Sequence, residues 1–164
     1  MRKLMLLVLT MTFLVSLTLS AADFGAQGAI EADKLTLEGM LTYAIQDEYL
    51  ARAEYMQIIQ TYGSMRPFSN IVKAEEKHIS LLTPLFEQYG FETPENNADE
   101  YVVIPEDMKT ALELGVHAEI ANIAMYEVFL QKELPADVRD IFERLMAASE
   151  NHLEAFRRSL RRYG

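Results

Sequence analysis

The chain has 164 residues, half of them hydrophobic, with a formal net charge of −10 and neither cysteine nor tryptophan. This length suffices for one domain with a buried core. The acidic charge argues against nucleic acid and anionic lipid as partners, and it is compatible with the attraction of cations. Without cysteine the chain has no disulfides, zinc–thiolate sites or iron–sulfur clusters, so any metal must be held by oxygen and imidazole ligands.

Residues 1–22 have the features of a secretory signal peptide. Arg2 and Lys3 precede the apolar run Leu4–Leu19, and the small residues "SAA" follow at 20–22. This pattern predicts cleavage and a secreted or periplasmic mature protein. The alternative is a membrane anchor formed by residues 4–22, but serine and threonine interrupt the run, which is shorter than the about 20 apolar residues of a typical span.

Residues 36–163 are predicted to form an all-α domain of four helices, preceded by a linker of small residues at 23–35. Apolar residues recur at helical spacing in four segments, near 36–62, 67–90, 105–132 and 135–162. Boundary residues support these limits: Thr36 is a suitable N-cap, Gly63 a suitable stop, and Pro67 a suitable first-turn residue.

The connections predict how these helices are arranged. About four residues join the first helix to the second and about three join the third to the fourth, so each pair is expected to form an antiparallel hairpin. About fifteen residues, "FETPENNADEYVVIP" at 91–105, join the hairpins. When extended they reach about 50 Å, more than the length of about 37 Å for a 25-residue helix. We therefore expect a crossover along the bundle, with 101–104 packed against it.

Five polar residues interrupt the apolar stripes. They are Glu48 in the first helix, Glu75 and His78 in the second, Glu119 in the third and His152 in the fourth. Each falls within about one turn of its helix's midpoint, so the arrangement would bring all five to one level of the core. Buried carboxylates need opposite charge or a raised pKa. Since a divalent cation compensates several carboxylates and accepts neutral imidazole, the pattern predicts a metal site.

Four stretches of the sequence resemble the ferritin-like superfamily, which includes rubrerythrins and bacterioferritins. They are "AIQDEYLARAEY" (Ala44–Tyr55), "AEEKHISLL" (Ala74–Leu82), "ALELGVHAEIANI" (Ala111–Ile123) and "ASENHLEAF" (Ala148–Phe156). The likeness is greatest to an uncharacterised ferritin-like domain family of bacteria and archaea. It implies a four-helix bundle whose metal pattern is one Glu from each of two helices and Glu-x-x-His from each of the others.

The resemblance implies a ligand set and a chemistry. Glu48, Glu75, His78, Glu119 and His152 match five of the six ligands, with Glu75 as the bridge. The sixth position is Ser149, and Glu150 points elsewhere on the helix. The implied cofactor is one or two iron ions, with manganese or zinc as alternatives. The implied activity is oxidation of Fe(II), or reduction of oxygen or peroxide, with an external electron donor because no rubredoxin-like cysteine site is present.

Two rival interpretations remain open at this stage. One is a non-catalytic metal-binding or interaction module at the cell envelope, which the missing carboxylate favours. The other is a purely structural cluster in which the polar groups satisfy one another. The sequence also leaves a homo-oligomer open. Other polar residues are expected to face solvent, and Tyr55 and Tyr126 are expected to be core aromatics; the solvent-facing residues are Asp47, Glu54, Glu76, His117, Glu143 and Glu154, with Asn122 and Glu127 at the border of a stripe.

Overall fold

The structure, a computed structural model, describes residues 23–163 and contains helices but no strand over that range. The prediction of an all-α chain is therefore confirmed. The four predicted helices are the long ones, α2, α3, α4 and α5, and the structure also contains two short elements. The bounds are α1 Gly25–Glu31, α2 Leu37–Tyr62, α3 Phe68–Tyr89, the 3₁₀ turn η2 Ala98–Glu100, α4 Met108–Leu130 and α5 Ala136–Leu160.

The ends of the long helices are fixed by local interactions that the sequence indicates. The Thr36 side chain accepts a hydrogen bond from the Gly39 N–H at 3.1 Å and caps the start of α2, and Gly63, with a φ of 90°, is the C-cap that follows its last residue. The third long helix begins later than predicted, at Met108, because Asp107 is its N-cap and accepts from the Thr110 N–H at 2.7 Å. The predicted boundaries thus hold to within a few residues.

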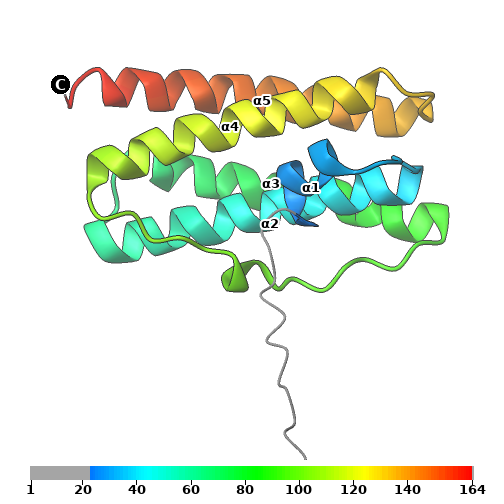
Figure 1. Cartoon of the computed structure of the whole chain (residues 1–164), viewed down its shortest axis with the longest axis horizontal. Helices are drawn as coiled ribbons and strands as arrows, with labels where there is room; N and C mark the ends of the chain where they lie inside the picture. The colour runs from blue at the N-terminus through cyan, green and yellow to red at the C-terminus, as the bar shows by residue number, and fades with distance from the viewer. Residues whose placement is uncertain (1–22, 164) are drawn as a thin grey trace, which may run out of the picture.

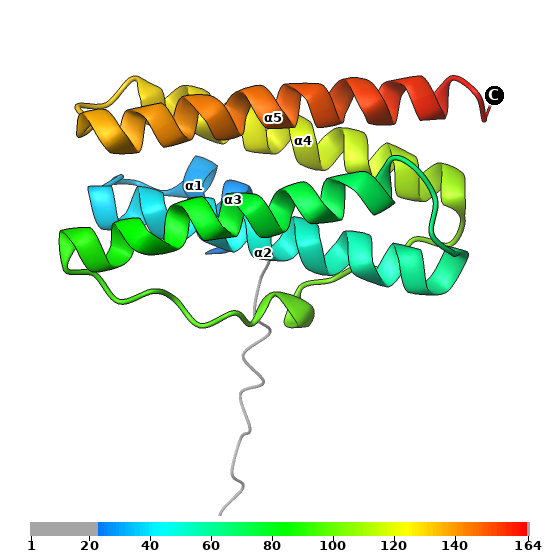
Figure 2. The same ribbon diagram turned by 180° about the vertical axis from the view of Figure 1, so that it is seen from behind.

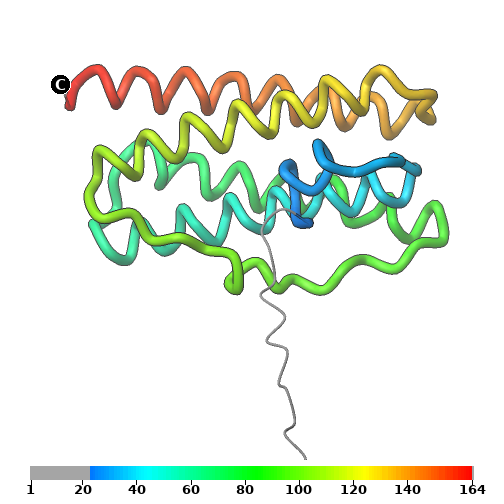
Figure 3. Tube along the Cα trace, in the orientation of Figure 1, coloured from blue at the N-terminus to red at the C-terminus, as the bar shows by residue number. Residues whose placement is uncertain are grey.

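The long helices form two antiparallel pairs that lie side by side. Helix α2 pairs with α3, and α4 pairs with α5, as the two opposite views show (Figures 1 and 2). The connection between the pairs runs along the length of the first pair (Figure 3). Within it, Tyr101 stacks on Phe24 with ring centroids 4.3 Å apart, whereas Val103 and Ile104 are exposed. The expectation that 101–104 packs along the helices therefore holds for Tyr101 but not for Val103 and Ile104.

Residues 23–35 differ from the predicted linker, because they contain helix α1, which packs across α2 and α4 (Figure 3). Small buried residues, among them Gly25 and Ala26, let the two-turn helix approach closely. Gly25 has a φ of +56°, and a Cβ at this position would lie 2.7 Å from Oδ1 of Asp47. Both the backbone conformation and the close contact therefore require glycine.

The apolar core consists of two clusters separated by a polar layer. One cluster surrounds Leu41, Phe86 and Phe129, and the other surrounds Phe68, Leu112 and Phe156. The buried polar side chains belong to the middle portions of the long helices, between these clusters. Within residues 23–163, no helix combines the length and the apolar character needed to cross a membrane. The predicted signal segment, residues 1–22, lies outside the described residues.

Candidate metal centre

The five residues that interrupt the apolar stripes all lie in the buried polar layer. Their exposed fractions are 2% for Glu48 and Glu75, 4% for Glu119, 6% for His78 and 9% for His152. They come from all four long helices and form two groups, each of which could hold a metal ion. The first is Glu48, Glu75 and His78, and the second is Glu75, Glu119 and His152. Glu75 belongs to both groups.

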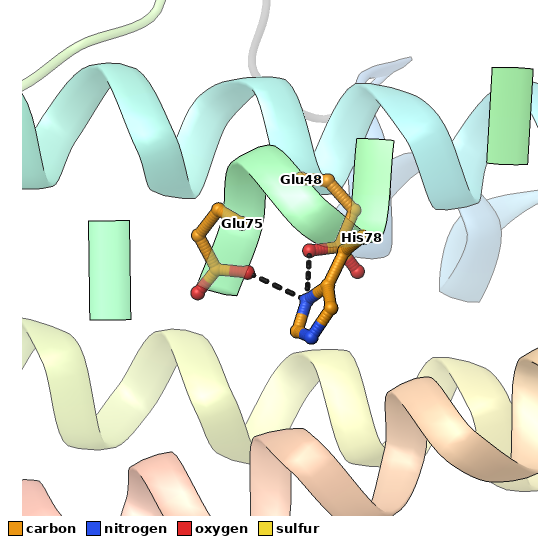
Figure 4. A group of neighbouring side chains, drawn as sticks. All are labelled: Glu48, Glu75 and His78. Atoms are coloured by element: carbon orange, nitrogen blue, oxygen red, sulfur yellow. Dashed lines mark hydrogen bonds and ion pairs between the residues drawn. The ribbon is translucent and has the colours of Figure 1, made fainter. Parts of the chain in front are cut away.

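In the first group, the imidazole of His78 lies between two carboxylates (Figure 4). Its Nδ1 is 2.8 Å from Oε2 of Glu75, one turn earlier on α3, and 3.0 Å from Oε2 of Glu48 on α2. Residues three apart share a helix face, which is why Glu75 and His78 meet. The three side chains thus direct two oxygens and one nitrogen toward a common point.

In the second group, Nδ1 of His152 lies 3.3 Å from Oε1 of Glu75 and 3.4 Å from Oε1 of Glu119. Neither contact has hydrogen-bond geometry, so among the described residues this buried nitrogen lacks a hydrogen-bond partner. Buried polar atoms are rarely left in this condition, and one explanation is an ion that binds there. The donor set therefore fits a cation.

The carboxylates and imidazoles of the cluster shift one another's pKa values. Burial acts to lower the pKa of His78, but the hydrogen bonds to Glu48 and Glu75 outweigh it and raise it to about 10. The pKa of His152 is likewise raised to about 9, because Glu119 and Glu75 outweigh burial. Burial raises the pKa of Glu48 to about 7, with the charge of Glu75 adding to it. The pKa of Glu75 is lowered, because the two imidazoles outweigh its burial.

Two tyrosines donate hydrogen bonds to Glu48 and Glu119, and each bond joins one helix pair to the other. Tyr55 on α2 donates a hydrogen bond to Glu119 on α4 at 3.0 Å, and Tyr126 on α4 donates to Glu48 on α2 at 3.0 Å. Both are fully buried, as expected for core aromatics, but the sequence analysis missed their polar role. The sequence shows only that each tyrosine follows the carboxylate of its own helix by seven residues, or two turns, and this spacing does not reveal a partner on another helix.

Ser149, which the resemblance places at the sixth ligand position, begins a hydrogen-bond chain that ends at Asp47. Ser149 Oγ donates to Asn122 Oδ1 at 2.7 Å, and Asn122 Nδ2 donates to Asp47 Oδ2 at 2.6 Å. The other oxygen of Asp47 accepts from the Ala26 N–H of α1 at 2.8 Å. The chain therefore links the centre of the polar layer to helix α1. Asn122, expected only at the border of its stripe, is buried.

Two of the acids predicted to face solvent are instead half-buried, and these predictions were wrong. Asp47 is covered by α1, and burial raises its pKa to about 6 although Asn122 and Ala26 donate to it. Glu54, two turns along α2, lies near Val103, and burial raises its pKa to about 7. The other acids expected at the surface, Glu76, Glu143 and Glu154, are exposed, as is His117. Glu127, expected at the border of its stripe, and Glu150 are exposed as well.

A small cavity adjoins the carboxylates on the side of Ser149. It is lined by Glu48, Glu75 and Glu119 together with Ser149 and Asn122, and its volume of about 10 Å³ is close to that of one water-sized sphere. The layer therefore has room for a small ligand next to the position where a carboxylate is replaced by serine.

Comparison with known proteins agrees with this picture of one helical domain. The chain is 28% identical over 134 residues to the uncharacterized protein MJ0754 of Methanocaldococcus jannaschii. The alignment covers 73% of this chain and 72% of the relative. The crystal structure of hypothetical protein MJ0754 from Methanococcus jannaschii superimposes with a TM-score of 0.71 and 26% sequence identity, covering 81% of this chain and 86% of that one. Residues 37–164, which include the four long helices and every member of the polar layer, match the family described as "Uncharacterized protein domain (DUF2202)". The chain belongs to that family.

Proposed function

We propose that residues 36–163 form a ferritin-like four-helix bundle that binds one or two iron ions and acts as an Fe(II) oxidase or another oxygen- or peroxide-reducing oxidoreductase. The observation that carries this proposal is the orientation of Glu75. One of its oxygens is 2.8 Å from Nδ1 of His78 and the other is 3.3 Å from Nδ1 of His152. A carboxylate that bridges two cations needs this orientation, with one oxygen toward each half of the site.

In this proposal Glu48 and His78 hold one ion, Glu119 and His152 hold the second, and Glu75 contacts both. Bound iron would supply one-electron chemistry toward oxygen or peroxide. The imidazoles must lose their Nδ1 protons before they can act as ligands, so metal binding releases protons. The same ligand set accepts manganese or zinc, so the choice of iron rests on the resemblance to the ferritin-like superfamily.

In this proposal the buried tyrosines hold the two carboxylate ligands that do not bridge, Glu48 and Glu119. Tyr126 donates to Oε1 of Glu48 and leaves Oε2 toward His78. Tyr55 donates to Oε1 of Glu119, the same oxygen that lies 3.4 Å from Nδ1 of His152. Such outer contacts typically change metal affinity by about 10- to 100-fold. Ser149 adds no charge, so each half of the site has two carboxylates and one imidazole, with Glu75 counted in both halves.

Metal content is the direct test. Elemental analysis of protein purified in air should find bound metal, and metal-free protein should take up Fe(II) without oxygen. Admission of oxygen should then produce the near-ultraviolet absorbance of oxidised iron faster than in buffer. Glu75→Ala should lose the metal, whereas Glu76→Ala, a change of the adjacent exposed acid, should retain it. A wild-type protein that binds no metal, or a Glu75→Ala variant with full metal content, would refute the assignment.

The alternative function is a metal-binding or interaction module without catalysis at the cell envelope. The neutral chain from Ser149 through Asn122 favours it, because an amide and a hydroxyl stand where a bridging carboxylate would support a change of oxidation state. The two functions differ in one measurement. A non-catalytic module binds Fe(II) but does not accelerate its oxidation.

We further infer that the protein is exported, with residues 1–22 removed, and that an external donor reduces the metal. The export proposal rests on the sequence pattern alone, and anchoring by residues 4–22 is its alternative. Cell fractionation and N-terminal sequencing of the native protein distinguish the two, since cleavage predicts a mature chain that starts close to Asp23. Light scattering of the same material would show whether a homo-oligomer forms.

A further inference from the structure

A surface groove lies immediately outside the candidate metal centre, between α1, α2, α4 and the crossover. Its volume is about 290 Å³, and its walls are mainly apolar, with Phe24, Leu50, Val103 and Leu114 among the lining residues. Each of these four residues comes from a different segment. The groove is therefore a product of the fold and not of one loop.

The groove and the small central cavity share two lining residues, Asp47 and Ala118. Each directly precedes a candidate ligand, since Glu48 follows Asp47 on α2 and Glu119 follows Ala118 on α4. A single layer of side chains thus separates the groove from the carboxylates. The second large surface cavity, of about 230 Å³ near Arg52 and Asp99, shares no lining residue with the central one.

The charges in the groove favour a cation. Asp47 and Glu54 place two half-buried carboxylates in its apolar lining, and no lysine or arginine of the described chain lines it. The other surface cavity, in contrast, contains the Arg52 guanidinium. Carboxylates in an apolar, water-poor setting attract a cation more strongly than exposed ones do.

We propose that metal ions reach the centre through this groove, passing Glu54 and then Asp47, and crossing between Asp47 and Ala118. The proposal rests on the proposed metal-binding function. Asp47 is suited to the last position before the ligands, because its two oxygens have separate partners. Oδ1 accepts from the Ala26 N–H and holds the side chain in place, so Oδ2 can exchange the Asn122 amide for a passing cation.

The rate of Co(II) uptake tests the route, with the visible absorption of the bound ion followed after rapid mixing with metal-free protein. Ala121→Leu, at a residue that lines the groove but not the central cavity, should obstruct the approach to the crossing, and a barrier raised by about 1.4 kcal/mol slows uptake about tenfold. The amount of Co(II) bound at equilibrium should remain that of the wild type. Ala124→Leu is the matched control, because Ala124 is on the same helix and does not line the groove.

A second variant, Glu54→Gln, tests the route without changing the size of a side chain, so a packing defect cannot explain its result. Glutamine retains an acceptor oxygen and removes the charge, which Glu54 carries fully only above its pKa of about 7. At about pH 8, uptake should therefore slow several-fold at low salt and approach the wild-type rate at high salt. The control is Glu76→Gln, an exposed acid on α3. If the wild type binds no Co(II), the proposed function and the route both fail. If it binds Co(II) and both groove variants load at the wild-type rate, only the route is overturned.

Discussion

The polar layer predicts that the metal-free protein loses stability as the pH rises from 7 to 9. The pKa values of His78 and His152 in the folded protein are about 10 and about 9, above the value of about 6.5 for histidine in an unfolded chain. A raised pKa stabilises the fold below the unfolded value, and this contribution is lost as the pH rises through the folded value. The raised pKa values of Glu48 and Asp47, about 7 and about 6, act with the same sign, but their contribution is lost mainly below pH 7 and adds little between pH 7 and 9.

The magnitude follows from the number of protons involved. Between pH 7 and 9 each of the two histidines is protonated in the folded protein and neutral in the unfolded chain. Each one therefore lowers the free energy of unfolding by about 1.4 kcal/mol for every unit by which the pH rises. Over two pH units the pair contributes a loss of about 4–5 kcal/mol. For a domain of this size the melting temperature should therefore fall by about 15 °C.

Calorimetric melts of chelator-treated protein at several pH values are the assay. His78→Gln should remove about half of the slope. His117→Gln is the matched control, because this histidine is exposed on α4 and has no contact with the three carboxylates. A melting temperature that stays constant from pH 7 to 9 would refute the idea that the imidazoles hold protons in the place of a cation.

Three substitutions give further expected outcomes. Ser149→Glu should raise the number of metal ions bound per chain, measured by elemental analysis, because it supplies the missing carboxylate. Tyr126→Phe should lower the free energy of unfolding, measured with denaturant, by about 1.5–3 kcal/mol, since Glu48 loses its donor; an unchanged value would contradict this role. Gly25→Ala should cost about 1–2 kcal/mol from the positive φ and should speed proteolysis before Thr36, whereas Gly39→Ala should not.

The sequence was sufficient to predict the four long helices, because their apolar residues recur at helical spacing. Glu48 and Glu119 could be found because each occupies a position where the pattern demands an apolar residue, and the burial of both agrees with that expectation. Their role as metal ligands remains a prediction. The cross-pair bonds from Tyr55 and Tyr126 were not foreseen, because they depend on how the two helix pairs face each other.

Helix α1 and what it covers could not be found in the same way. A two-turn helix of small residues has too few apolar positions to show a period, so residues 23–35 resembled a linker. Asp47 and Glu54 therefore seemed to lie on an open face of α2. Their burial depends on a segment distant in the sequence, which no pattern within α2 can reveal.

The position of Phe24 and Ala26 has a practical consequence for producing the protein. Phe24 is part of the groove wall, and Ala26 binds Asp47. A purification tag or fusion partner joined ahead of residue 23 would start at the mouth of this groove, and a polyhistidine tag would bring competing imidazoles to the same place. The opposite terminus follows Leu160 at one end of the helices (Figure 1). Recombinant protein for metal measurements is best made with its tag there.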